Sequence, residues 1–223
     1  MPDADDVAPR TLIVLRPVGS PLPLGFFAFG TGVALTSLLE LQVLTASHRV
    51  AVLLLTFTAP LELLGAVFAF LARDSGAGTA LAVFGGSWVS TGTSLLLAPE
   101  GSRSAVTGAY DLALVAVLAV MALAARQGKP ALTVLLTLAS VRFGASGLYE
   151  STGAAPARQL AGIVGTVVVA FSLYGGLALL LEDGQGQTVL PLGRRGRARS
   201  ALEDGLGAQL RGLDSEAGVR RQL

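Results

Sequence analysis

The sequence predicts an all-α integral membrane protein, a six-transmembrane-helix bundle. Its 223 residues are 52% hydrophobic and only 14% charged, with a mean hydropathy of +0.66. Soluble domains carry about 25% charged residues, so this composition is typical of a membrane protein. The charge is also segregated, because long tracts between residues 22 and 181 contain none.

Six tracts are long and apolar enough to cross a membrane, which takes about 20 residues. They cover residues 22–44, 50–72, 78–98, 109–125, 131–149 and 159–181. Short connections force each helix to run antiparallel to the next. We therefore predict a cytosolic segment at 1–20, a six-helix domain at 21–182 and a cytosolic tail at 183–223.

The first tract begins at RPVGSPLPLGFFAFG, residues 16–30, which holds three prolines and three glycines. Proline has no N–H, and that loss is tolerated at a helix entrance. We expect Pro21 and Pro23 to keep SPLPLG extended at the cytosolic mouth. Irregular backbone is permitted there if it lines water or protein rather than lipid.

The second tract contains Glu62, two residues after Pro60. Ionisable residues in a membrane span are costly and usually face protein or water, so they indicate a pathway. One interpretation is that Glu62 takes up a proton during transport, because an apolar site disfavours an ionised carboxyl. The other is a hydrogen bond to a backbone group that is freed near Pro60.

The fifth tract contains Arg142. Its guanidinium matches a carboxylate with two parallel hydrogen bonds, so Arg142 is a candidate for binding substrate. It is also a candidate for a buried ion pair with Glu62 or Glu40, which is the more common situation for such a residue. We expect Glu40 and Glu150, near the outer ends of their tracts, to be solvated, and His48 to lie exposed in the first outer turn.

The distribution of positive charge orients the bundle. Cytosolic segments tend to carry the excess of Lys and Arg. With both termini cytosolic, the inner side holds Arg10, Arg16, Arg73, Arg126, Lys129, Arg194, Arg195, Arg197 and Arg199, against Arg49, Arg103 and Arg158 outside. The cluster at 194–199 is a topology anchor that can touch anionic membrane lipid. Leucines at helical spacing in 201–215 predict a short amphipathic tail helix.

Several classes of function are disfavoured by composition. There is no cysteine, and the single histidine has no cluster of carboxylates or nucleophiles at metal-site or catalytic spacing. We expect no enzyme activity, metal or cofactor. The formal net charge of +1 does not indicate a surface that binds nucleic acid.

Three stretches together resemble one transporter family. SPLPLGF at 20–26, with Ser20, Pro21, Pro23, Leu24 and Gly25, is similar to an Asn-Pro-Ala-Pro-Leu-Gly-Leu signature. LELLGAVFAFLARDSGAGTALAVFGGSWVS at 61–90 includes an aromatic-glycine step ahead of Trp88, and QTVLPLG at 187–193 resembles a closing Thr-Val-Leu-Pro-Ile-Gly. The family is the acetate uptake transporters of the succinate-acetate permease type. Tyr174 falls where the family has a tyrosine in its last helix.

The resemblance implies a homo-hexamer in the plasma (inner) membrane with a separate pathway through each protomer. It implies transport of acetate or another small carboxylate, commonly with a proton. It also implies a constriction at Phe29 and Phe84, where the family usually has tyrosine. The third constriction residue falls at Ala139, with Leu138 beside it, so the gate is wider or is closed by another side chain.

Departures from the family keep alternatives open. Glu62 replaces a glutamine, Arg142 replaces an apolar residue, and Ser20 replaces the signature asparagine. A fixed positive charge favours anions but can hold a dicarboxylate too tightly for fast passage. The alternatives are a channel for a small neutral solute and a solute-sensing or divergent membrane protein that does not transport.

Overall fold

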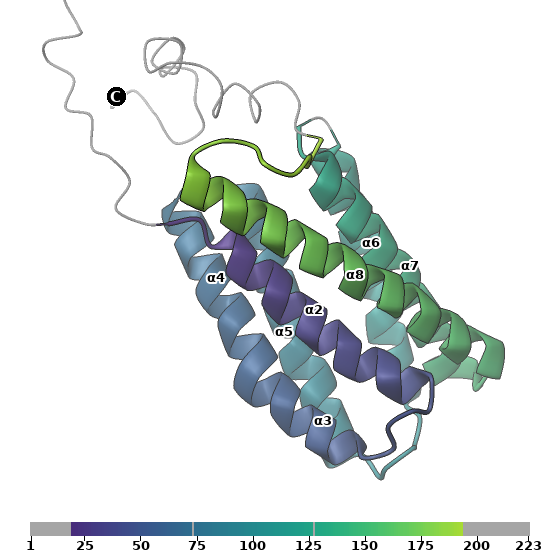
Figure 1. Ribbon diagram of the computed structural model, residues 1–223. Coiled ribbons are helices and arrows are strands. Elements are labelled where there is room, and N and C mark those ends of the chain that lie inside the picture. The colour runs from purple at the N-terminus through teal and green to yellow at the C-terminus, as the bar shows by residue number, and fades with distance from the viewer. Residues whose placement is uncertain (1–18, 73, 127, 194–223) are drawn as a thin grey trace, which may run out of the picture.

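Six membrane-length helices form the bundle in a computed structural model that describes residues 19–193 except 73 and 127 (Figure 1). The helices are α2 (Leu22–Glu40), the second span in three parts, α5 (Ser75–Leu97), α6 (Ala105–Ala125), α7 (Pro130–Thr152) and α8 (Ala155–Gln185). The described part of the chain contains no strand. The six-helix prediction is confirmed.

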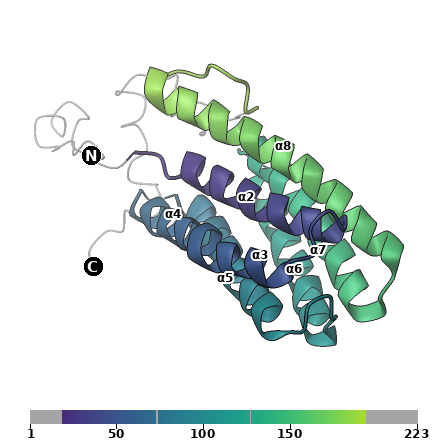
Figure 2. The ribbon, with the colours of Figure 1, turned by 60° about the horizontal axis from the view of Figure 1, so that its bottom comes forward.

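Consecutive helices pack against each other in the bundle, and the first membrane helix also packs against the last. Helix α8 packs along both α2 and α7, α6 packs along α7, and α4 packs along α5. Figures 1 and 2 both show α2 against α8 along most of its length. We call the end with the connections 41–46, 98–104 and 153–154 the outer end, and the opposite end the inner end.

Helix α2 begins one residue after Pro21, so the predicted extended SPLPLG segment is wrong. Pro21 is the N-cap, Pro23 lies in the first turn, and the Gly25 amide donates to the Pro21 carbonyl at 3.1 Å. First-turn amides have no partner within the helix in any case, so proline costs little there. The helix ends at Glu40, four residues early, before Gln42 with a φ of 60°.

The second span, Ser47–Leu71, contains a wide turn. It consists of α3 (Ser47–Leu53), a π-helical turn η2 (Leu54–Thr58) and α4 (Ala59–Leu71). The Ala59 amide donates to the Leu54 carbonyl, five residues earlier. Pro60 follows and has no N–H to continue the α-helical pattern. Thr58 and Glu62, on either side of Pro60, are both fully buried.

Helix ends at the two membrane faces are capped by local residues. Asp74 accepts from the Ala77 amide at the start of α5, and Ser104 does the same for Thr107 at the start of α6. Asp74 also pairs with Lys129, which joins the inner ends of α5 and α7. Gly153, with a φ of 75°, ends α7 in the left-handed conformation that favours glycine.

Helix α8 runs to Gln185, so the predicted domain boundary at 182 falls inside a helix. The chain then turns back across the inner end, as Figure 1 shows, and buries Leu192 in the core. The predicted N-terminal segment up to residue 18, the basic cluster at 194–199 and the tail helix at 201–215 lie outside the described residues.

Candidate functional site

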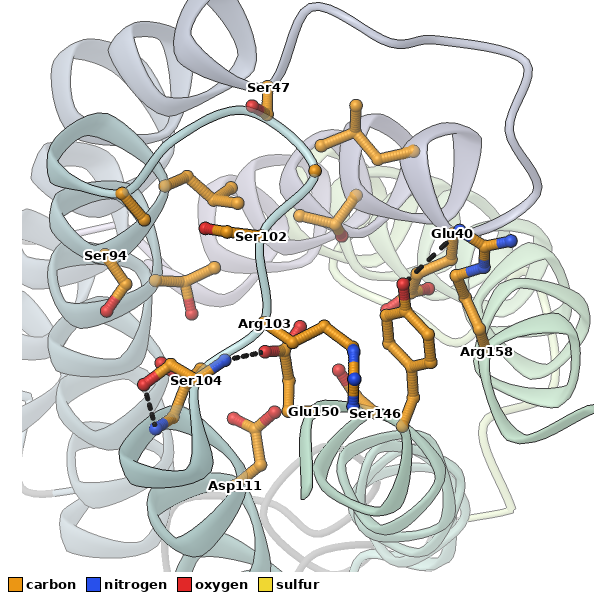
Figure 3. A pocket seen from close by; sticks show the side chains of 18 of the residues that line it. Glu40, Ser47, Ser94, Ser102, Arg103, Ser104, Asp111, Ser146, Glu150 and Arg158 are labelled. Atoms are coloured by element: carbon orange, nitrogen blue, oxygen red, sulfur yellow. Dashed lines mark hydrogen bonds between the residues drawn. The ribbon is translucent and has the colours of Figure 1, made fainter. Parts of the chain in front are cut away.

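A cavity of about 580 Å³ opens between the outer ends of α2, α5, α6 and α7 (Figure 3). We call it the outer cavity. Its lining includes three acidic and three basic side chains, which are Glu40, Asp111, Glu150, Arg103, Arg142 and Arg158. The formal charges of these six balance, so the outer cavity is polar without a strong field of one sign.

Arg142 projects from α7 and is only 5% exposed. Its Nη2 donates to Thr36 Oγ1 at 2.9 Å and to Glu40 Oε1 at 2.7 Å, both on α2. Of the two ion pairs that the sequence suggested, the structure contains the one with Glu40. The expectation of a solvated Glu40 is wrong, because α2 ends at this residue with its carboxyl turned towards α7.

Asp111 is a lining residue that sequence reasoning missed. It lies on α6, is 5% exposed, and lines the outer cavity together with Ser146 of α7. Figure 3 shows the Asp111 carboxyl directed into the outer cavity near Ser146. The signal was present, since a single acidic residue inside the tract 109–125 meets the same criterion that singled out Glu62.

The other charged groups of the outer cavity lie nearer its mouth. Glu150 Oε2 accepts from the Ser104 amide at 2.8 Å. Arg158 lies over the Tyr149 ring, with its guanidinium carbon 5.1 Å from the ring centroid. His48, in the first turn of α3 rather than in the connection before it, is part-exposed, and its Nε2 lies 2.9 Å from the Ala98 carbonyl. Glu150 is therefore tied to the α5–α6 connection rather than simply solvated.

Three aromatic rings close the inward end of the outer cavity. The centroid of Phe29 lies 4.2 Å from that of Phe84 and 5.8 Å from that of Trp88. All three are almost fully buried. Trp88 lines the outer cavity, whereas Phe29 and Phe84 line a second cavity on the inner side. We call this layer the aromatic pinch.

Ala139 lies at the level of the aromatic pinch. On α7, Leu135 lines the inner side and Phe143 lines the outer cavity, and Ala139 is four residues from each. Residues four apart share one helix face, so Ala139 stands between the two cavities. It is almost fully buried, whereas Leu138 is half-buried and lines neither cavity. Because the Ala139 side chain is small, the layer is closed by the rings of Phe29, Phe84 and Trp88.

The second cavity, which we call the inner cavity, has a volume of about 20 Å³. Its walls are apolar except for Glu62, and they include Gly25 of the SPLPLG motif together with Leu81 and Leu135. Glu62 is 0% exposed, and among the described residues neither carboxyl oxygen has a hydrogen-bond partner. The expected bond to a backbone group near Pro60 is therefore not present.

The remaining residues singled out by sequence lie at the inner end, away from both cavities. Ser20 is exposed and Leu24 is half-buried beside the start of α2. Tyr174 donates to the Pro191 carbonyl at 2.9 Å and so holds the segment after α8 against that helix. The described residues also contain no group of three His, Asp or Glu that could hold a metal ion.

No protein-family model matches the chain, and no curated protein matches it. Among solved structures it is similar to the bacterial acetate channel SatP, with a TM-score of 0.72 and 19% sequence identity. The alignment covers 79% of this chain and 99% of that one. At this identity the likeness shows a shared fold, and the role of each residue has to be argued from its own surroundings.

Proposed function

From its likeness to the fold of a bacterial acetate channel, we propose that this chain moves acetate or a related small carboxylate through a pathway within each protomer. The observation that carries the proposal is that the outer cavity, the aromatic pinch and the inner cavity follow one another within a single protomer. Arg142 stands at the outer side of the pinch and Glu62 at the inner side. The proposed pathway therefore has one ionisable group on each side of an apolar barrier.

Arg142 would select for a carboxylate at the base of the outer cavity. A buried arginine presents directed donors that match carboxylate oxygens, and Thr36 and Glu40 fix its orientation. Because Glu40 neutralises Arg142, the attraction for an anion is moderate. Moderate attraction suits conduction, which requires a solute to leave as readily as it binds.

The aromatic pinch would favour passage of the uncharged acid. An isolated carboxylate is strongly disfavoured between apolar rings, whereas a protonated carboxyl loses much less hydration free energy. We therefore propose that a proton crosses with the solute. Glu62 is the group placed to exchange that proton, since it is the one titratable residue among the described residues that line the inner cavity.

We propose a homo-hexamer in the plasma membrane with both termini cytosolic. This assembly rests on the family resemblance, and the excess of basic residues on the inner side supports the orientation. Large apolar side chains, such as those of Phe57, Phe70 and Leu97, are exposed on the perimeter of the bundle. Such faces are compatible with membrane lipid and with neighbouring protomers.

A channel for a small neutral solute is the second candidate. It is favoured by the pairing of Arg142 with Glu40, because a neutralised arginine gives an anion no large advantage over a polar neutral molecule. Urea is a suitable probe of this alternative.

The test is uptake of labelled acetate and labelled urea into proteoliposomes, with and without an imposed pH gradient. We expect acetate uptake above that of protein-free liposomes, which report passive permeation of acetic acid. An acidic exterior should increase the protein-dependent part. Folded protein that takes up only urea would replace the proposal by the second candidate, and no uptake of either would remove both.

A further inference from the structure

Two side chains of opposite charge line the outer cavity and retain binding capacity. Arg142 uses Nη2 for Thr36 and Glu40, and among the described residues its Nη1 makes no hydrogen bond. Asp111 forms no ion pair within the same part of the chain. Arg142 therefore has a donor atom, and Asp111 an acceptor atom, that can contact a ligand.

The two groups reach the outer cavity from neighbouring helices. Ser146 follows Arg142 by four residues on α7, which places these two residues on one helix face with their Cα atoms about 6 Å apart along the axis. Asp111 of α6 lies near Ser146 in the outer cavity. Because Arg142 and Asp111 line the same cavity, a small molecule inside it can contact both.

Both side chains are held in place before any ligand binds. Arg142 and Asp111 are each 5% exposed, and Arg142 is anchored to α2 by the two bonds described above. A ligand therefore has little side-chain freedom to remove on binding. Figure 3 shows Asp111 and Ser146 directed into the cavity.

We propose that the base of the outer cavity binds a short carboxylate that carries a hydroxyl or ammonium group at its other end. The carboxylate contacts Arg142 Nη1, and the hydroxyl or ammonium donates to Asp111. This inference rests on the proposed function and narrows its substrate class. Acetate has no second group and leaves Asp111 unmatched, whereas a dicarboxylate brings a second acceptor against it.

Trp88 allows binding to be measured without transport. It is the only tryptophan of the chain and lines the same cavity, so its fluorescence reports occupancy. The full chain in detergent is titrated with glycolate, glycine, acetate and malonate, and the same ligands are repeated by calorimetry. We expect glycolate or glycine to bind about tenfold more tightly than acetate, as one hydrogen bond to a charged group predicts. Malonate should bind no better than acetate.

The Asp111→Asn variant tests the assignment of the second group. Asparagine keeps the shape of the side chain but loses its charge. The preference over acetate should fall about tenfold while acetate affinity is unchanged. The matched control is Asp183→Asn, an exposed carboxyl at the inner end of α8, which should leave every affinity unchanged.

Equal affinities for glycolate, glycine and acetate, or no binding of any of them, would overturn the inference. So would a preference that survives Asp111→Asn. If that variant does not fold, the ligand series on the unaltered chain decides. Acetate uptake without a preference overturns this inference alone, whereas a preference without uptake overturns the proposed function and leaves the binding site. Comparison of glycolate with glycine shows which donor the site takes.

Discussion

Arg142 and Glu62 are ionisable side chains inside membrane spans, and they differ in whether a partner matches them. Arg142 meets Glu40 and Thr36 within hydrogen-bonding distance, so its charge is matched inside the protein. Glu62 has no such partner among the described residues and faces an apolar cavity of about 20 Å³. That volume is enough for about one water molecule. An unmatched carboxyl beside so small a cavity suits a group that exchanges a proton.

Glu62→Gln should abolish the response of acetate uptake to a pH gradient. One pH unit supplies about 1.4 kcal/mol per proton, so one-to-one coupling allows up to about tenfold accumulation. Glutamine has nearly the same size and cannot exchange a proton. We expect gradient-driven uptake by the variant to fall to that of protein-free liposomes under the same gradient, as measured with labelled acetate.

The control for this variant is Glu100→Gln, in the exposed connection between α5 and α6. It should retain the full gradient response. An unaltered response in Glu62→Gln would remove Glu62 from proton coupling and leave it as a structural residue.

At the scale of elements, glycines decide how closely the first three spans approach. A Cβ added at Gly32 of α2 would lie 2.7 Å from Thr58 Cγ2 and 3.0 Å from ring atoms of Trp88. Thr58 belongs to the wide turn and Trp88 to α5. Gly32 therefore sits where α2, η2 and α5 meet, directly beside the aromatic pinch.

Gly32→Ala should destabilise the protein by about 1–3 kcal/mol, the usual cost of overpacking a tight interface. The matched control is Gly86→Ala in α5, where an added Cβ meets nothing within 4 Å. That change should be neutral or stabilising by up to about 1 kcal/mol, because alanine is the better helix former. Thermal unfolding in detergent measures both. Equal effects of the two substitutions would contradict the close contact at Gly32.

The elements also show where sequence reasoning stops. Hydropathy predicted six spans because the length of a helix that crosses a membrane is fixed by the membrane. It did not predict the wide turn before Pro60, since a missing amide can be accommodated by a kink, by water or by a π-helical turn. It placed Pro21 and Pro23 in an extended segment, although proline is compatible with the first helical turn.

At the scale of the whole molecule, partnerships between distant residues were the hardest to predict. Periodicity cannot show that Arg142 meets Glu40 rather than Glu62, because that depends on which helices become neighbours. The position of Asp111 inside the tract 109–125 was signal enough to single it out, but its place in the same cavity as Arg142 depends on how α6 and α7 pack. The constriction at Phe29, Phe84 and Ala139 came from the family resemblance and stays a prediction, although the rings of Phe29 and Phe84 do lie 4.2 Å apart.

The orientation of the whole bundle can be tested directly, because the natural chain has no cysteine. Single variants Ser102→Cys and Ser75→Cys each introduce one thiol at an exposed position. Ser102 lines the outer cavity, and Ser75 begins α5 at the inner end. If the outer end faces away from the cytosol, a membrane-impermeant maleimide added to intact cells should label Ser102→Cys and leave Ser75→Cys unmodified.

Permeabilised cells provide the control, since both variants should then be labelled to a similar extent. Labelling of Ser75→Cys but not Ser102→Cys in intact cells would reverse the orientation derived from the basic residues.

The same reagent also tests the outer cavity as an open vestibule. Ser102 lines the outer cavity and is exposed, so it stands at the rim. Modification of the Ser102→Cys thiol by a bulky maleimide should slow uptake, because every solute on the proposed pathway passes that rim.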